Sequence, residues 1–132
     1  MRRRAKARLV GEILVTYFLT RWRMRRGALP TVVAGLRDVD ATAVGPPLSP
    51  AQRLRLGRAV MRTLARLPSD SRCLVRSLVL LRLLARRGVA AVLVIAARPG
   101  DPDRLDAHAW VEVEGQPVLP PAAADYGRLV TL

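Results

Sequence analysis

Residues 72–86 constrain the fold more than any other segment, because they predict a helix that is apolar over most of its circumference. At about 100° per residue, its arginines share one arc of roughly 140°. These are Arg72, Arg76, Arg82, Arg86 and Arg87. Leucines dominate the remaining arc, where Ser77 is the only other polar side chain beyond the start of the helix. We therefore expect a central core helix whose arginine stripe faces solvent.

The segments before this helix also predict helical structure. Residues 5–25 repeat apolar side chains at four-residue spacing, which predicts an amphipathic helix with arginine on its other face. Residues 27–48 are rich in Gly, Pro and Asp and are interpreted mostly as a connector, with one short element at residues 31–36. The run Ser49-Pro50-Ala51-Gln52 predicts a capped helix start, and that helix is expected to end near residue 67.

The segments after the central helix predict a small antiparallel sheet. Residues 68–71 supply candidate helix caps, and Gly88 is the expected C-terminal cap. Residues 89–97 are rich in Val, Leu and Ile and predict a buried strand, whereas residues 107–114 alternate and predict a second strand. A turn at Gly115-Gln116 then returns the chain as a hairpin through residue 119.

These elements predict an α+β fold in one domain spanning residues 1–132. A helical part at residues 1–67 would surround a core at residues 68–132, in which the central helix packs on the sheet. The length of 132 residues suits a single domain. One cysteine and one histidine exclude a disulfide framework and make a metal site implausible, so no metal and no cofactor are expected.

The net charge of +13 is distributed unevenly along the chain. Residues 1–98 carry a balance of +17 and residues 99–132 a balance of −4. Such a basic surface favours nucleic acid, an anionic membrane or an acidic peptide as a partner. Aromatic residues make up only 4% of the chain, and no nucleic-acid motif is present, so nucleic acid is not expected. A non-catalytic basic binding or scaffold protein for an acidic peptide, a partner protein or nucleic acid remains the alternative reading.

No targeting or membrane-spanning segment is expected. The apolar stretch at residues 9–20 follows a basic start but contains Glu12, and no small-residue cleavage site follows it. Residues 73–97 are long enough to span a membrane, but arginines interrupt them. The sequence therefore predicts a cytoplasmic protein.

Two residues are candidates for chemistry. Cys73 lies in the first turn of the central helix, where the helix dipole and Arg76 favour a thiolate nucleophile. A buried inert thiol is the alternative for Cys73. His108 lies on the second strand, on the face that also carries Asp106, Trp110 and Glu112. Alone it would be an exposed strand histidine, but a Cys opening a helix and a His on a following strand are the parts of a Cys–His nucleophilic site.

The residues around this pair resemble those of a known family. The runs 73–78 (CLVRSL), 83–88 (LLARRG) and 107–115 (AHAWVEVEG) resemble the lasso-peptide leader peptidases. These are transglutaminase-like cysteine proteases, in the same family as the microcin-processing protease. The resemblance is specific over residues 70–120. The preceding residues lack the several strands of the precursor-recognition domain, so the chain resembles the stand-alone form.

This resemblance implies a transglutaminase/papain-like core and a hydrolase with defined partners. The enzyme would remove the leader from a ribosomally made precursor, working with a separate leader-recognition protein. An ATP-dependent lasso cyclase would then receive the freed core peptide. Carried over by position, Cys73 is the nucleophile and His108 the general base. Arg76, Trp110 and Glu112 are candidates for substrate binding, with Trp110 equally a packing anchor.

The third catalytic residue of the family is not evident. It is an aspartate about a dozen residues after the histidine, and residues 118–121 contain no carboxylate at that register. Asp106 and Asp125 are the candidates, and Glu112 shares the face of His108. A Cys–His dyad, or a backbone carbonyl that orients the imidazole, are the further alternatives.

Overall fold

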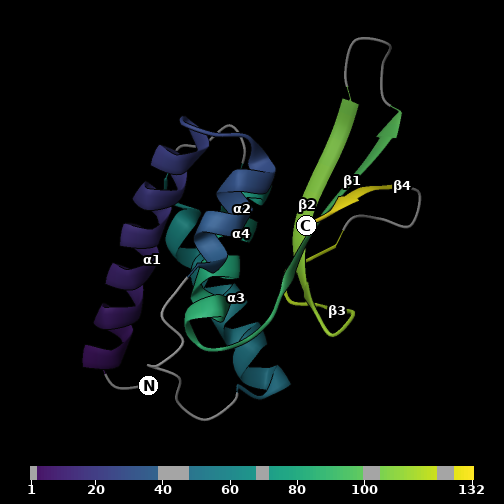
Figure 1. The fold of residues 1–132 in the computed structure, drawn as a ribbon. Helices are drawn as coiled ribbons and strands as arrows, with labels where there is room; N and C mark the ends of the chain where they lie inside the picture. Colours follow the sequence, from purple (N-terminus) through teal and green to yellow (C-terminus); the bar gives the residue numbers. More distant parts are fainter. Residues whose placement is uncertain (1–2, 39–47, 68–71, 100–104, 122–126) are drawn as a thin grey trace.

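The computed structural model describes residues 3–38, 48–67, 72–99, 105–121 and 127–132. It consists of a layer of helices beside an antiparallel sheet (Figure 1). The helices are α1 (Arg3–Met24), α2 (Leu29–Arg37), α3 (Pro50–Leu64) and α4 (Arg72–Arg86). The strands are β1 (Val92–Pro99), β2 (Leu105–Val113), β3 (Gln116–Pro117) and β4 (Gly127–Thr131). The predicted α+β class is therefore confirmed, and the candidate caps at 68–71 lie outside the described residues.

Helix α4 is the central helix of the core, as its apolar circumference predicts. It packs against α1, α2 and α3 and against strands β1 and β2. Its side chains from Leu78 to Leu81, together with Leu83 and Leu84, are buried. Helix α4 therefore joins the other three helices to the sheet.

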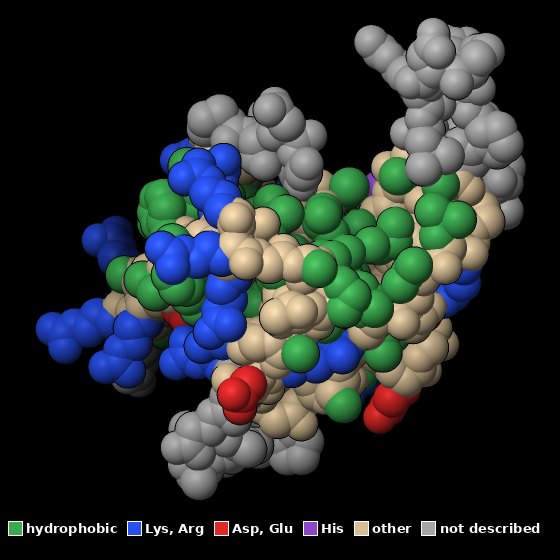
Figure 2. Space-filling model, turned by 45° about the horizontal axis from the view of Figure 1, so that its top comes forward, with side chains coloured by type: hydrophobic (Ala, Val, Ile, Leu, Met, Phe, Trp, Pro, Cys, Tyr) green, Lys and Arg blue, Asp and Glu red, His purple; other side chains and the backbone are tan. Residues whose placement is uncertain are grey.

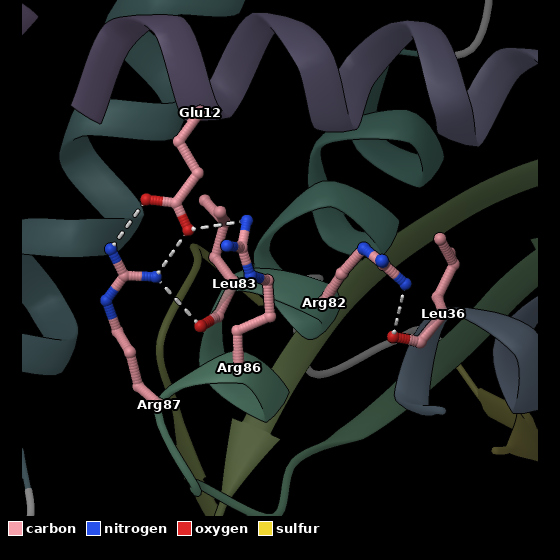
Figure 3. Close-up of polar contacts among 6 residues, drawn as sticks. All are labelled: Glu12, Leu36, Arg82, Leu83, Arg86 and Arg87. Atoms are coloured by element: carbon pink, nitrogen blue, oxygen red, sulfur yellow. Dashed lines mark hydrogen bonds and ion pairs between the residues drawn. The ribbon is translucent and has the colours of Figure 1, made fainter. Parts of the chain in front are cut away.

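The arginine stripe of α4 is only in part the solvated face that the sequence predicts. Arg87 binds both carboxylate oxygens of Glu12 on α1, at 3.0 and 2.9 Å, and Arg86 approaches the same carboxylate at 3.2 Å (Figure 3). Arg82 donates to the carbonyl oxygen of Leu36 at the end of α2, at 3.3 Å. The prediction is wrong for Arg82 and Arg87, because α1 and α2 pack over part of this arc of α4 and receive their guanidinium groups. It holds for Arg86, which stays exposed beside Glu12.

Burial has a measurable consequence for Arg82. Desolvation lowers the pKa of its guanidinium, and the neighbouring charges of Arg23 and Arg86 act in the same direction, while Asp38 opposes them. The group nevertheless stays charged at neutral pH, because arginine starts from a very high pKa. Arg82 is thus a half-buried cation that holds the end of α2 against α4.

The segment at residues 27–48 contains a full helix, α2, which the connector interpretation understates. Pro30 lies in the first turn of α2, where a missing amide proton costs nothing. Val32, Val33 and Leu36 follow at helical spacing, and all three are buried. By contrast, the predicted start of α3 is confirmed: the Ser49 hydroxyl accepts from the amide of Gln52, and the Gln52 side chain accepts from the amide of Ser49.

The sheet has the strand order β3-β2-β1-β4, with all neighbours antiparallel. Strands β1 and β2 form the predicted pair, in a register that places Ala96 opposite His108. The predicted sheet ends at residue 119, so β4 is an addition. Leu132 continues its pairing by exchanging two backbone hydrogen bonds with Leu93, and Arg37 of α2 donates to the carbonyl oxygens of Ala91 and Leu132.

In the part of the chain that the structure describes, no helix combines the length and the apolar character needed to cross a membrane.

Candidate active site

Cys73 and His108 line one small pocket. Its volume is about 90 Å³, and its other lining residues are Met61, Arg76, Ala109, Leu119 and Pro120. These residues come from α3, the first turns of α4, strand β2 and the segment that follows β3. The structure thus brings together the two residues that the sequence singles out for chemistry, 35 positions apart in the chain.

The position of Cys73 follows from the start of α4 at Arg72. In the first turn of a helix the backbone amides have no acceptor within the helix, so they point outward with their positive dipole ends. Cys73 is a half-buried free thiol. Its own carbonyl oxygen accepts a hydrogen bond from the Ser77 hydroxyl at 2.7 Å, which ties the first turn of the helix to the second.

The imidazole of His108 is oriented by a backbone carbonyl. Its Nε2 atom lies 2.9 Å from the carbonyl oxygen of Pro120. A carbonyl oxygen only accepts, so Nε2 carries the proton and donates, and Nδ1 of the neutral ring is left as an acceptor. Pro120 follows His108 by 12 positions, which is the register at which the resemblance places an aspartate. The carbonyl of Pro120 therefore occupies the sequence position of the expected carboxylate.

The segment that carries this carbonyl is anchored on two sides. The amide of Val118 donates to the carbonyl of Val111 on β2, at 2.8 Å. On the other side, Gly57 of α3 lies so close that a Cβ atom there would meet the Val118 oxygen at 2.7 Å. The absence of a side chain at Gly57 is what allows α3 to pack against residues 118–119, and this packing positions Pro120.

Trp110 and Glu112 form a layer beside His108 instead of lining the pocket. The two side chains are 5% and 7% exposed, and the indole Nε1 donates to Glu112 at 2.9 Å. Arg128 of β4 donates to both carboxylate oxygens of Glu112, at 2.9 and 3.3 Å. The Trp110 ring stacks on the His108 ring, with centroids 6.0 Å apart. Trp110 therefore covers a face of the imidazole, while the hydrogen bond to Pro120 engages its Nε2 atom.

Glu112 is held in its ionised form by these contacts. Desolvation by burial would raise the pKa of its carboxyl, but hydrogen bonds from Trp110 and Arg128 and the charge of Arg128 outweigh burial and lower that pKa. Both oxygens of the carboxylate are engaged, so Glu112 has little capacity left for a substrate. Its geometry is that of a group that joins β4 to β2.

The remaining candidates are placed as follows. Arg76 lines the pocket, and its buried Nε atom has no hydrogen-bond partner among the described residues. Asp106 pairs with Arg98 in the backbone register of β1 and β2. Nothing is described of the Asp106 side chain, and Asp125 lies outside the described residues. The described residues contain no cluster of three or more His, Cys, Asp or Glu side chains that could hold a metal ion.

Sequence reasoning missed several residues of the site. Met61 and Leu119 line the pocket, and neither carries a motif that would have marked it. Arg128 was missed because the strand that carries it was not predicted. Pro120 lies at the register where the resemblance places an aspartate, and a backbone carbonyl is among the expected alternatives.

A thiol at the start of the central helix and an oriented imidazole on the adjoining sheet define an α+β protein in which a cysteine and a histidine line one pocket. A family model described as the transglutaminase-like superfamily matches residues 13–131. The chain belongs to that superfamily. No curated protein and no solved structure matches it.

Proposed function

We propose that this protein is a cysteine peptidase that removes the leader from a ribosomally synthesised lasso-peptide precursor. The observation that carries the proposal is the pocket shared by Cys73 and His108, with His108 oriented through Nε2 by Pro120. Membership in the transglutaminase-like superfamily supports a Cys–His thiol chemistry. The sequence runs around both residues support the narrower assignment to leader removal.

The first half of the reaction forms an acyl-enzyme. Nδ1 of His108 accepts the proton of the Cys73 thiol, and the thiolate attacks the carbonyl carbon of the scissile peptide bond. The carbonyl oxygen becomes an oxyanion, which the amide of Cys73 at the start of α4 can stabilise. The imidazolium then returns its proton to the leaving nitrogen, so the C–N bond breaks and the core peptide departs with a free amine.

The second half releases the leader. Water gives a proton to His108 and its oxygen attacks the thioester carbon, and the proton goes back to the Cys73 sulfur as the C–S bond breaks. The products are the leader carboxylate and the restored thiol. Throughout, Nε2 keeps its hydrogen bond to Pro120, so the ring does not rotate between the two proton transfers.

The proposed partners are the precursor leader, a separate leader-recognition protein and an ATP-dependent lasso cyclase. The charge of the chain suits an acidic leader or an acidic partner surface, because arginine residues on α1 and α3 remain exposed. The cyclase would consume the amine that cleavage liberates. A cytoplasmic location is part of this proposal, since the precursor is made there.

The experiment is cleavage of a candidate precursor, encoded nearby, by the protein together with its recognition partner. Mass spectrometry should detect the leader and core fragments with the wild type and with Glu114→Gln, an exposed change in the turn after β2. Cys73→Ala and His108→Ala should each abolish cleavage while keeping the wild-type circular dichroism and unfolding temperature. Cleavage by folded Cys73→Ala would refute the proposal.

A non-catalytic scaffold is the second candidate, and the neutral acceptor at Pro120 is the observation that favours it. A carbonyl stabilises an imidazolium less than a carboxylate does, because it carries only a partial charge. Alkylation of Cys73 by iodoacetamide at neutral pH separates the two readings. The peptidase requires that His108→Ala slow alkylation at least about tenfold. Equal rates in the wild type and in this variant would favour the scaffold.

A further inference from the structure

The outward face of α1 carries large apolar side chains that no part of the described chain covers. Val15, Phe18 and Trp22 are 69%, 64% and 51% exposed, and they lie three or four residues apart on one side of the helix. Phe18 and Trp22 are two of only five aromatic residues in the chain. Helix α1 lies at the outer edge of the helical layer (Figure 1). We call these three residues, with the basic residues described next, the α1 outer surface.

Basic side chains flank this apolar band at both ends. Arg4 and Arg8 are exposed on the turns before it, and Arg25 and Arg26 are exposed after it. The Arg26 guanidinium lies over the Trp22 ring, 4.5 Å from its centroid. Figure 2 shows Lys and Arg side chains projecting around hydrophobic ones at the left of the molecule, where Figure 1 places α1.

No acidic side chain of α1 balances these charges. Glu12 is the single acidic residue between Arg3 and Arg37, and its carboxylate is bound by Arg86 and Arg87 of α4. All the charged groups of the α1 outer surface are therefore positive. A second copy of the same surface would be repelled, and an anionic partner would be attracted.

Three apolar side chains on a convex helix offer a small contact area compared with the roughly 800 Å² that each partner buries in a stable protein interface. A lipid surface suits them better. Trp and Phe partition into the headgroup region of a bilayer, and arginines around them contact lipid phosphates while their stems remain apolar. An apolar band with cations at both ends is the pattern expected of a helix that lies parallel to a bilayer surface.

We propose that the α1 outer surface binds anionic phospholipid bilayers, with Phe18 and Trp22 in the headgroup region and Arg4, Arg8, Arg25 and Arg26 on the phosphates. The protein would bind peripherally, with α1 still packed on α4 through its opposite face, where Ile13 and Tyr17 are buried. This proposal is independent of the chemistry at Cys73.

Trp22 reports binding directly, because the other tryptophan, Trp110, is buried in the sheet. The full chain is titrated with vesicles of phosphatidylcholine and phosphatidylglycerol at a 3:1 ratio, in a buffer of about 0.1 M salt. Co-sedimentation with these vesicles gives a partition coefficient. The Trp22 emission should shift to the blue. The shift should be absent with pure phosphatidylcholine and should decrease at high salt, because screening weakens the attraction.

Paired variants locate the contact. The double variant Arg25→Gln with Arg26→Gln should lower the partition coefficient by about fivefold per arginine. Adding Phe18→Ser to this variant should lower the partition coefficient further. The charge-matched control is Arg55→Gln with Arg58→Gln on α3, where both arginines are exposed. Leu129→Ser on β4 is the apolar control, because Leu129 is also exposed. Both controls should change binding much less, and all variants should unfold at the wild-type temperature.

Two results would overturn the proposal. An unshifted Trp22 emission with anionic vesicles would exclude the lipid, and an equal loss in the α3 control would show that net charge alone drives binding. A blue shift on adding polyglutamate, with none on adding vesicles, would assign the α1 outer surface to an acidic protein segment instead.

Discussion

Adding one methyl group at Gly57 should destabilise the protein and displace the carbonyl that orients His108. A Cβ at Gly57 would meet the Val118 backbone oxygen at 2.7 Å, with the Val118 and Leu119 side chains at 3.4 and 3.5 Å. Carbon and oxygen normally approach to about 3.3 Å, so the backbone must move by about 0.6 Å. Pro120 follows two residues later, so its hydrogen bond with His108 should lengthen.

The expected magnitude comes from two opposing contributions to the free energy of unfolding. Alanine is better than glycine inside a helix by about 1 kcal/mol. Overpacking of a filled contact costs about 1–3 kcal/mol. Gly11→Ala on α1 is the matched control, because nothing lies within 4 Å of the added carbon. That variant should gain the helix contribution without the packing cost.

Urea unfolding of the two variants measures the difference. Gly11→Ala should be more stable than the wild type by up to about 1 kcal/mol, and Gly57→Ala should lie below Gly11→Ala by about 1–3 kcal/mol. Precursor cleavage should fall in Gly57→Ala and stay unchanged in Gly11→Ala. Equal stabilisation by both substitutions would refute the close contact between α3 and the segment at Val118.

Three further predictions concern other contacts. In a urea titration, Glu12→Gln should lower the free energy of unfolding by about 2 kcal/mol, because charge-assisted bonds to two arginines are lost. Glu114 is exposed and has one arginine at 3.9 Å, so Glu114→Gln should change the free energy of unfolding by less than about 0.5 kcal/mol. Ser49→Ala should cost about 1 kcal/mol, measured by thermal unfolding, because the capping bond to Gln52 is lost. The folded pKa of Glu112 lies below its ordinary value of 4.5, so its ion stabilises the fold above that pH, and this stability is lost as the pH falls through the lowered pKa. The unfolding temperature of the wild type should therefore exceed that of Glu112→Gln at neutral pH, and a difference that does not shrink in acid would contradict the assignment.

The central helix and the strand that carries His108 could be predicted from the sequence because their signals are local, whereas the association of Cys73 with His108 depended on the family resemblance. The arginine arc of α4, roughly 140° wide, leaves an apolar arc that predicts burial over most of the helix. The alternation around His108 predicts a strand. The capping box at Ser49 is also a local pattern, and it forms as predicted. In each case the residues that decide the structure lie within a few turns or one strand.

The features that were not predicted depend on contacts between distant segments. Strand β4 is short and exposed, and it is held by pairing with β1 and by Arg37, which lies 95 residues before Leu132. Arg82 and Arg87 are half-buried, contrary to the expectation, because a helical wheel cannot show that α1 and α2 cover part of that arc of α4. A backbone carbonyl is among the expected alternatives for orienting His108, but which carbonyl takes that role depends on how the segment after β3 packs on α3 and β2.

The central position of α4 separates the parts of the pocket that can vary from those that cannot. Cys73 and Arg76 lie on the helix that supports the whole core, so substitutions around them carry a cost in folding. Met61 reaches the same pocket from α3 and is only half-buried, whereas Leu119 is buried and packs against Gly57. Changes in the shape of this pocket should therefore accumulate at Met61, while the helix that bears the thiol stays constrained by the fold it holds together.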